Sequence, residues 1–191
     1  MNLSPLACLL LFSEISSVKR TDANIFGTNK GDLMRKTLHE LAAGYAAASG
    51  CLCKSEDGSC QAVLTVEGLD VHIGLVESSG MIVFQTGVAL LPQAGREEFC
   101  MKLLTANNLF LDTMGFTLGV DEHQELVTIQ LAWDLSHLEA ESFARIVNNL
   151  LAVAADWMIR LNEWRLSSSA GDGSAPAENS GEVPFMNFLK V

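Results

Sequence analysis

The chain has 191 residues, of which 49% are hydrophobic and 7% aromatic, which is enough apolar material for the core of one compact domain. The 12 basic and 23 acidic residues give a net charge of −11, and 8 of the basic and 17 of the acidic residues fall within residues 34–165, so the charge is not confined to a tail. Phosphate backbones and anionic lipid repel such a domain. The composition therefore argues against nucleic acid and membrane insertion, and it favours a basic polypeptide as partner.

The first 31 residues show no sustained periodicity, and we expect a weakly ordered extension. Residues 5–12 form an apolar run without a preceding basic residue or a following cleavage site, which favours an extension or a mis-chosen start codon over a signal peptide. The chain has five cysteines, namely Cys8, Cys51, Cys53, Cys60 and Cys100. This odd number indicates reduced thiols and a cytoplasmic location.

Residues 32–49 are predicted to form a helix, with Asp32 as its N-cap and Gly50 as its stop. A polar turn over residues 51–59 leads into three strands, at 60–67, 69–75 and 81–90. The turn at Gly68 and the turn at 78–80 are both short, so the three strands form an antiparallel meander.

A second helix is predicted over residues 94–111, followed by a hairpin with strands at 116–120 and 126–133. Residues 139–165 carry a broad apolar stripe and form the last helix. The predicted fold class is therefore α+β, in the order helix, three strands, helix, two strands, helix, with helices covering an antiparallel sheet. The domain at 32–165 is followed by a flexible Ser/Gly linker at 166–182 and an apolar tip at 183–191.

No set of catalytic residues is recognisable, because the chain lacks the glycine-rich nucleotide loops and the Gly-x-Ser-x-Gly nucleophile motif. Cys51-x-Cys53 with Cys60 lacks the usual zinc spacing and a nearby fourth ligand. The histidines lie on four separate elements or turns and are interpreted as surface or hydrogen-bonded residues: His39, His72, His123 and His137. We therefore predict no enzyme, no cofactor and no metal.

Asn107 and Asn108 are adjacent inside the second predicted helix, where asparagine is unfavourable. The pair indicates a helix end or a side chain that caps nearby backbone. We favour that structural role over contact with a ligand.

Four motifs, in this order, resemble the class I type III secretion chaperones, the Tir chaperone family. They are Asp-Gly-Ser-Cys-Gln-Ala-Val-Leu-Thr-Val-Glu-Gly at 57–68, Leu-Leu-Thr-Ala-Asn at 103–107, Phe-Thr-Leu-Gly-Val-Asp at 116–121 and the helix at 143–161. The resemblance covers about residues 34–165. Residues 1–31 have no counterpart that we can match. The linker and the tip lie beyond the core of the family, although some members also carry variable tails.

The resemblance implies a bacterial homodimer that binds the N-terminal segment of a secreted effector in extended form. The residues implied at the dimer interface are Leu104, Asn108, Leu111, Phe116, Leu118 and Val120. The resemblance also implies that apolar side chains of the client fill grooves on the helix and sheet surfaces. The candidates for client contact are Leu41, Tyr45, Val63, Val71, Ile73, Val83 and Leu126. Apolar side chains on both faces of the meander exceed what one small core can hide, which agrees with a binding role.

Two other functions stay open at this stage. A regulatory or sensory domain of the same general fold, such as the YbjN-like proteins, would bind a protein partner without export. An enzyme or metalloprotein is the third hypothesis. The apolar tip at 183–191 suggests a further hypothesis, in which it occupies the client groove when no effector is bound.

Overall fold

The computed structural model describes residues 29–169, with side chains up to residue 166. Its elements divide into two compact units, one containing residues 29–86 together with 130–151, and the other containing 87–129 and 152–169. We call them unit 1 and unit 2. The predicted tip and most of the predicted extension and linker lie outside the described residues.

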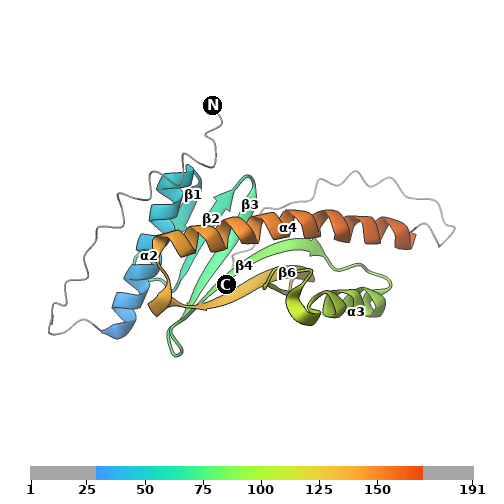
Figure 1. Cartoon of the computed structure of the whole chain (residues 1–191), viewed down its shortest axis with the longest axis horizontal. Helices are drawn as coiled ribbons and strands as arrows, with labels where there is room; N and C mark the ends of the chain where they lie inside the picture. The colour runs from blue at the N-terminus through green and yellow to red at the C-terminus, as the bar shows by residue number, and fades with distance from the viewer. Residues whose placement is uncertain (1–28, 170–191) are drawn as a thin grey trace. The chain divides into compact units, whose positions relative to one another are not determined.

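Six strands form one sheet in the order β1-β2-β3-β4-β6-β5 (Figure 1). The predicted meander is confirmed, because β2, β3 and β4 pair antiparallel in sequence order. The sheet also contains a strand that was not predicted, β1, in the segment expected to be a polar turn. The strands are β1 (Leu52–Ser55), β2 (Gln61–Val66), β3 (Leu69–Val76), β4 (Met81–Leu90), β5 (Thr117–Asp121) and β6 (Leu126–Asp134).

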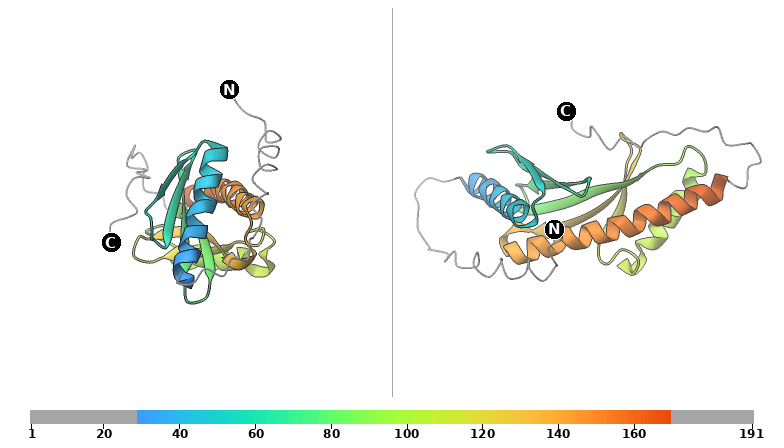
Figure 2. Two further views of the ribbon diagram at one scale, coloured as in Figure 1. Left: turned by 90° about the vertical axis from the view of Figure 1, so that its left-hand side faces the viewer. Right: turned by 90° about the horizontal axis from the view of Figure 1, so that it is seen from above.

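The first described helix, α2 (Lys30–Ser49), contacts β1, β2 and β3, and Figure 2 shows it beside these strands from two further directions. It ends as predicted at Gly50, whose φ of 72° is left-handed and whose N–H donates to the carbonyl of Ala46 at 2.9 Å. The predicted N-cap was wrong. Asn29, not Asp32, caps the helix, because its side-chain oxygen accepts from the N–H of Gly31 at 3.3 Å.

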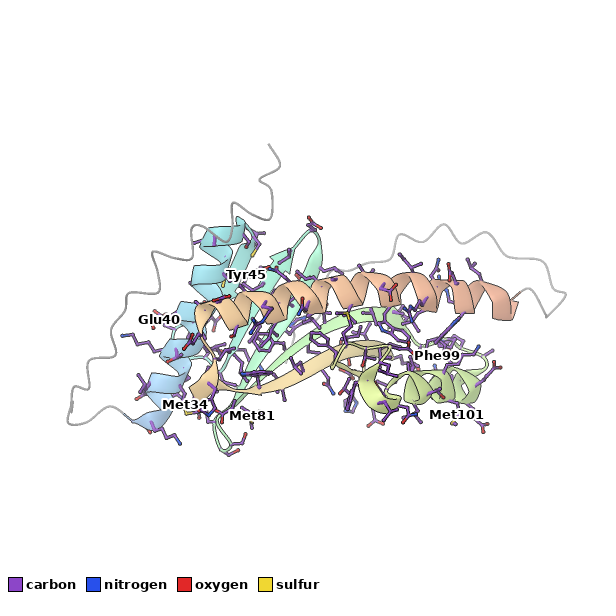
Figure 3. The ribbon with its side chains drawn as sticks, in the orientation of Figure 1. Met34, Glu40, Tyr45, Met81, Phe99 and Met101 are labelled. Carbon is purple, nitrogen blue, oxygen red and sulfur yellow. The ribbon has the colours of Figure 1, made fainter. Side chains whose placement is uncertain are left out.

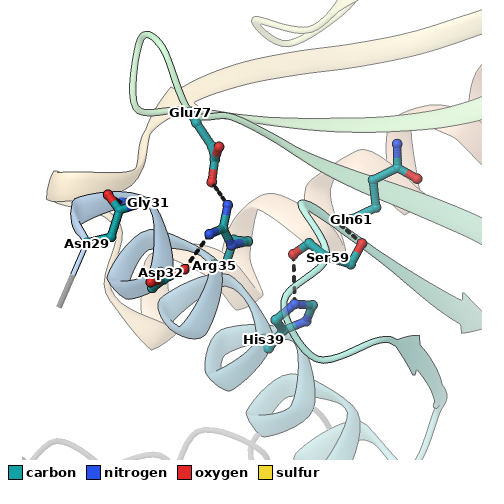
Figure 4. Close-up of polar contacts among 8 residues, drawn as sticks. All are labelled: Asn29, Gly31, Asp32, Arg35, His39, Ser59, Gln61 and Glu77. Carbon is teal, nitrogen blue, oxygen red and sulfur yellow. Dashed lines mark hydrogen bonds and ion pairs between the residues drawn. The ribbon is translucent and has the colours of Figure 1, made fainter.

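Asp32 has another partner, since Arg35 donates to it and also to Glu77 in the turn between β3 and β4 (Figure 4). One turn further along α2, His39 Nε2 lies 2.9 Å from the carbonyl oxygen of Ser59. A carbonyl only accepts, so Nε2 carries the proton. These contacts tie α2 to the loops at the ends of the strands.

The core of unit 1 lies between one face of the sheet and the two helices α2 and α4 (Ala140–Ser169), the latter contributing its first turns. Ala62, Ile73 and Phe84 stand side by side across three strands and are at most 1% exposed. The ring of Phe143 meets Phe84 at 5.3 Å and Tyr45 at 6.1 Å between centroids, both edge to face. Three elements distant in sequence therefore share one packed cluster.

In unit 2 the helix α3 (Arg96–Ala106) is shorter than predicted, because it ends at Asn107 and a 3₁₀ turn, η2 (Asn108–Phe110), follows. The side chain of Asn107 bonds to the backbone of Leu118, so the predicted structural role of this asparagine is confirmed. The last helix, α4, continues to Ser169 and thus extends into the segment predicted as linker; before it lies a second 3₁₀ turn, η3 (Leu135–His137).

Candidate functional site

The outer face of the sheet in unit 1, opposite the core, mixes apolar and polar side chains. The register aligns Lys54, Val63, His72 and Gln85 across β1 to β4. Val63 is 8% exposed, Lys54 is exposed, and the other residues of this face, including Val83 and Met81 of β4, are half-buried or exposed. This face therefore offers partly accessible apolar area beside hydrogen-bonding groups.

Polar contacts on the outer face are local. Thr65 donates to the carboxylate of Asp70 at 2.6 Å, one row away from His72. Partial burial lowers the pKa of His72 below its ordinary value, and the nearby Asp70 carboxylate offsets this only in part. Near neutral pH the imidazole of His72 on the outer face is therefore neutral.

The strand β1 forms one edge of the sheet, and it pairs only with β2 among the described residues. An edge strand exposes backbone N–H and C=O groups that another extended chain can pair with. Leu52, at the start of this edge, is 67% exposed. The edge and the outer face together could hold an extended peptide by backbone pairing and by side-chain burial.

The predicted client residues fall in three different environments. Only Val63 and Val83 lie on the outer face, two strands apart and in neighbouring rows of the register. Val71 and Ile73 belong to the core face, at 0% and 1% exposed. The other three predicted residues are Tyr45, buried on α2 with its hydroxyl donating to Asn148 at 2.8 Å; Leu41, half-buried on α2; and Leu126, half-buried in unit 2.

Four of the six residues predicted at a dimer interface are exposed, namely Leu104, Asn108, Leu111 and Val120. Phe116 and Leu118 are 4% and 5% exposed, so they belong to the core of unit 2. Leu104 and Leu111 are 63% and 78% exposed, more than Val120 at 43%.

Further exposed apolar residues, which were not predicted, join these positions. Figure 3 shows Phe99 and Met101 on opposite sides of α3; Phe99 is buried and Met101 is 57% exposed. Leu109 and Phe110 lie in the run Asn-Leu-Phe-Leu at 108–111, which was predicted as the end of the second helix. We call the whole set the apolar surface of unit 2: Met101, Leu104, Leu109, Phe110, Leu111, Met114 and Val120.

Within the part of the chain that the structure describes, no three His, Cys, Asp or Glu side chains come together as a metal ion would require. The four cysteines in this part are free thiols. Among residues 29–169 we find no helix long and apolar enough to cross a bilayer. The features that stand out are thus an edge strand with its outer face and an apolar surface, and both are suited to binding polypeptides.

Comparison with solved structures finds a similar fold in the ExsC–ExsE complex, with 20% identity and a TM-score of 0.56 over 65% of this chain and 92% of that chain. Two further similarities are to the HopA1–SchA chaperone–effector complex (16% identity, TM-score 0.49, 73% of this chain and 98% of that chain) and to the heterodimeric ExoU–SpcU complex of the Pseudomonas aeruginosa type III secretion system (15%, 0.39, 58% and 78%). No curated protein matches the chain.

The family comparison covers most of the described residues. The model of the Tir chaperone protein (CesT) family matches residues 28–158, which is more than half of the chain and includes all four motifs except the last residues of the fourth. This chain therefore belongs to the Tir chaperone protein (CesT) family, as its motifs indicated.

Proposed function

We propose that this protein is a cytoplasmic chaperone of bacterial type III secretion, which binds the N-terminal segment of an effector in extended form and keeps it soluble and competent for export. The observation that carries the proposal is the family match over residues 28–158. The exposed edge and outer face of the sheet in unit 1 support it, because they suit an extended chain. The same match favours export over the YbjN-like regulatory alternative.

In this proposal the effector segment pairs with β1 and lays alternate side chains over the outer face, beside Val63 and Val83. An edge of four residues provides few backbone hydrogen bonds, each worth about 1 kcal/mol net. Ordering one residue of a disordered chain costs about 1–2 kcal/mol, so backbone pairing alone does not hold it. Buried apolar side chains must supply the rest, and the client segment is therefore long.

We propose no catalytic step, since the function described needs only binding. The net charge of −11 adds long-range attraction toward a basic client and repulsion toward nucleic acid. Free thiols at Cys51, Cys53, Cys60 and Cys100 are consistent with a reducing cytoplasm.

We also propose that the chain forms a homodimer through the apolar surface of unit 2. A second copy carries the same charge of −11, so most of its surface is repelled. Residues 104–120 contain a single charged residue, Asp112, so two copies that meet at this segment face little local repulsion. Apolar side chains also suit a two-fold interface, in which the same patch must complement itself.

The client site is tested by purifying the tagged chain from its native bacterium and mapping the bound protein by limited proteolysis and mass spectrometry. We expect one larger partner with about 50–100 protected residues near its N-terminus. Val83→Glu places an unpaired charge on the outer face and should reduce recovery at least about tenfold.

Ile159→Glu is the matched control, because Ile159 is an aliphatic residue 62% exposed on α4, outside the proposed site, and this variant should retain the partner. A partner protected only over a folded domain, or a Val83→Glu variant that retains its partner, would show that the client site is wrong.

A further inference from the structure

Residues 107–118, which connect α3 to β5 and include the first two residues of that strand, present apolar side chains outward. Leu109, Phe110, Leu111 and Met114 are 50–78% exposed, whereas Thr113 between them is fully buried. A loose loop would turn its large apolar side chains inward, because their exposure to water is unfavourable. Their outward position therefore requires that other contacts hold the backbone.

Asn107 closes the segment at its base. Its side-chain Nδ2 donates to the carbonyl of Leu118 at 2.9 Å, and its Oδ1 accepts from the N–H of Leu118 at 2.8 Å. The amide thus pairs with the first half of β5 as a neighbouring strand would. Leu118 is 5% exposed, so both bonds are shielded from competing water.

Trp157 of α4 holds the middle of the same segment. Its indole Nε1 donates to the backbone carbonyl of Asp112 at 3.1 Å, and its side chain is 1% exposed. The ring meets Trp164 edge to face at 5.9 Å between centroids, and Trp164 meets Phe99 of α3 at 6.3 Å. The carbonyl of Asp112 is therefore attached to a packed aromatic cluster.

The backbone conformation between Asn107 and Leu118 is unfavourable by itself. Leu109, Phe110 and Met114 have φ of 57°, 55° and 52°, in the left-handed region that large L residues avoid. These three residues are also among the exposed apolar ones. A segment held in this way keeps its shape before a partner arrives, which reduces the ordering cost of association.

We propose that residues 108–116 form a preformed docking loop for a second copy of this chain, and that Asn107 and Trp157 are the positioning residues that set its conformation. The inference rests on the proposed homodimer and adds to it the means by which the interface is built. Neither residue needs to touch the partner; each acts through the backbone it holds.

The test compares Trp157→Phe and Asn107→Ala with the wild-type chain by sedimentation velocity over a concentration series, with hydrogen exchange of the loop amides as a second readout. Trp157→Phe removes the indole donor and keeps an aromatic ring, and Asn107→Ala removes both side-chain bonds to Leu118 without adding a charge. The control is Tyr45→Phe, which removes a hydrogen bond within unit 1, to Asn148.

Both loop variants should raise the dimer dissociation constant at least about tenfold and speed exchange in residues 108–118, while Tyr45→Phe should leave both unchanged. Faster exchange with a dissociation constant within about threefold of wild type would overturn the proposal, because the loop would then be loosened without affecting association. A wild-type chain that stays monomeric would instead remove the homodimer itself. The two failures are therefore distinguishable.

Discussion

Two adjacent leucines of α3 lie in different environments, Leu104 on the proposed interface and Leu103 in the core of unit 2. Leu104 is 63% exposed and Leu103 is 3% exposed. Full burial of a leucine side chain is worth about 1.5–3 kcal/mol, so the exposed part of Leu104 has about 1–2 kcal/mol left to gain on association. In a two-fold interface every residue occurs twice, which gives about 2–4 kcal/mol per dimer.

Leu104→Ala should therefore weaken the dimer about a hundredfold, since about 1.4 kcal/mol corresponds to a factor of ten. Alanine is a good helix former and the position is exposed, so the stability of the single chain should hardly change. Sedimentation equilibrium measures the dissociation constant, and urea unfolding at a concentration below it measures the stability of the chain.

Leu103→Ala is the control, because it should lower the stability of the single chain and hardly change the dimer dissociation constant. It creates a cavity in the core and should cost about 2–5 kcal/mol of unfolding free energy. Its effect on association should be no larger than the fraction of unfolded chain explains. Dimers of Leu104→Ala as tight as those of the wild type would refute the proposed placement of the interface.

Three further predictions concern stability. Gly87→Ala should cost about 1–3 kcal/mol in thermal unfolding, because an added Cβ would lie 2.7 Å from Leu126 Cδ2, and Leu126→Ala should recover much of that loss in a double-mutant cycle. Gly68→Val should destabilise the β2–β3 hairpin by about 1–2 kcal/mol in urea unfolding, since Gly68 has a φ of 87°. His72→Gln should flatten the fall in stability between about pH 7 and pH 5, as followed by thermal melts across that range. The pKa of His72 is lowered in the folded state, so on acidification the unfolded chain binds the proton first and the stability of the wild type decreases as the pH is lowered. A glutamine variant with the same pH dependence as the wild type would exclude His72 as the source of this decrease.

The strand meander could be predicted because periodicity is a local property. The alternation of Leu69, Val71, Ile73 and Leu75 defines a strand face without reference to any partner. It does not say whether that face meets the core or a client, and in the structure Val71 and Ile73 are core residues. The outer face of the sheet gives no such alternation in the sequence, where Val63 and Val83 are isolated apolar residues.

The edge strand β1 could not be predicted for a related reason. Four residues, Leu-Cys-Lys-Ser, are too few for an alternation to be distinguished from chance, and none of them is β-branched. Pairing with β2 makes them a strand, with Cys53 opposite Leu64 and Lys54 opposite Val63. The conformation of such a segment depends on its neighbour in space and not on its own pattern.

The end of α3 was predicted in part. Asparagine at 107 indicated a helix end or a cap on nearby backbone, and the structure shows both. The apolar residues that follow still fit helical spacing, so residues 108–111 were assigned to the helix. The left-handed backbone of Leu109 and Phe110 depends on Leu118 and on Trp157, a residue 45 positions from its acceptor Asp112, and no local pattern contains that information.

The acidic charge links the two proposed surfaces. A chain with a net charge of −11 attracts a basic client over long range and repels its own copy by the same field. The client site can therefore include charged and polar groups such as Lys54 and Asp70, while a self-association surface has to be nearly free of charge. Residues 104–120, with Asp112 as their single charge, meet this condition, and the carbonyl of that same residue is the one that Trp157 holds. A further acidic residue on this segment, as in Leu111→Asp, would add two like charges across the two-fold axis and should abolish the dimer without affecting client binding at β1.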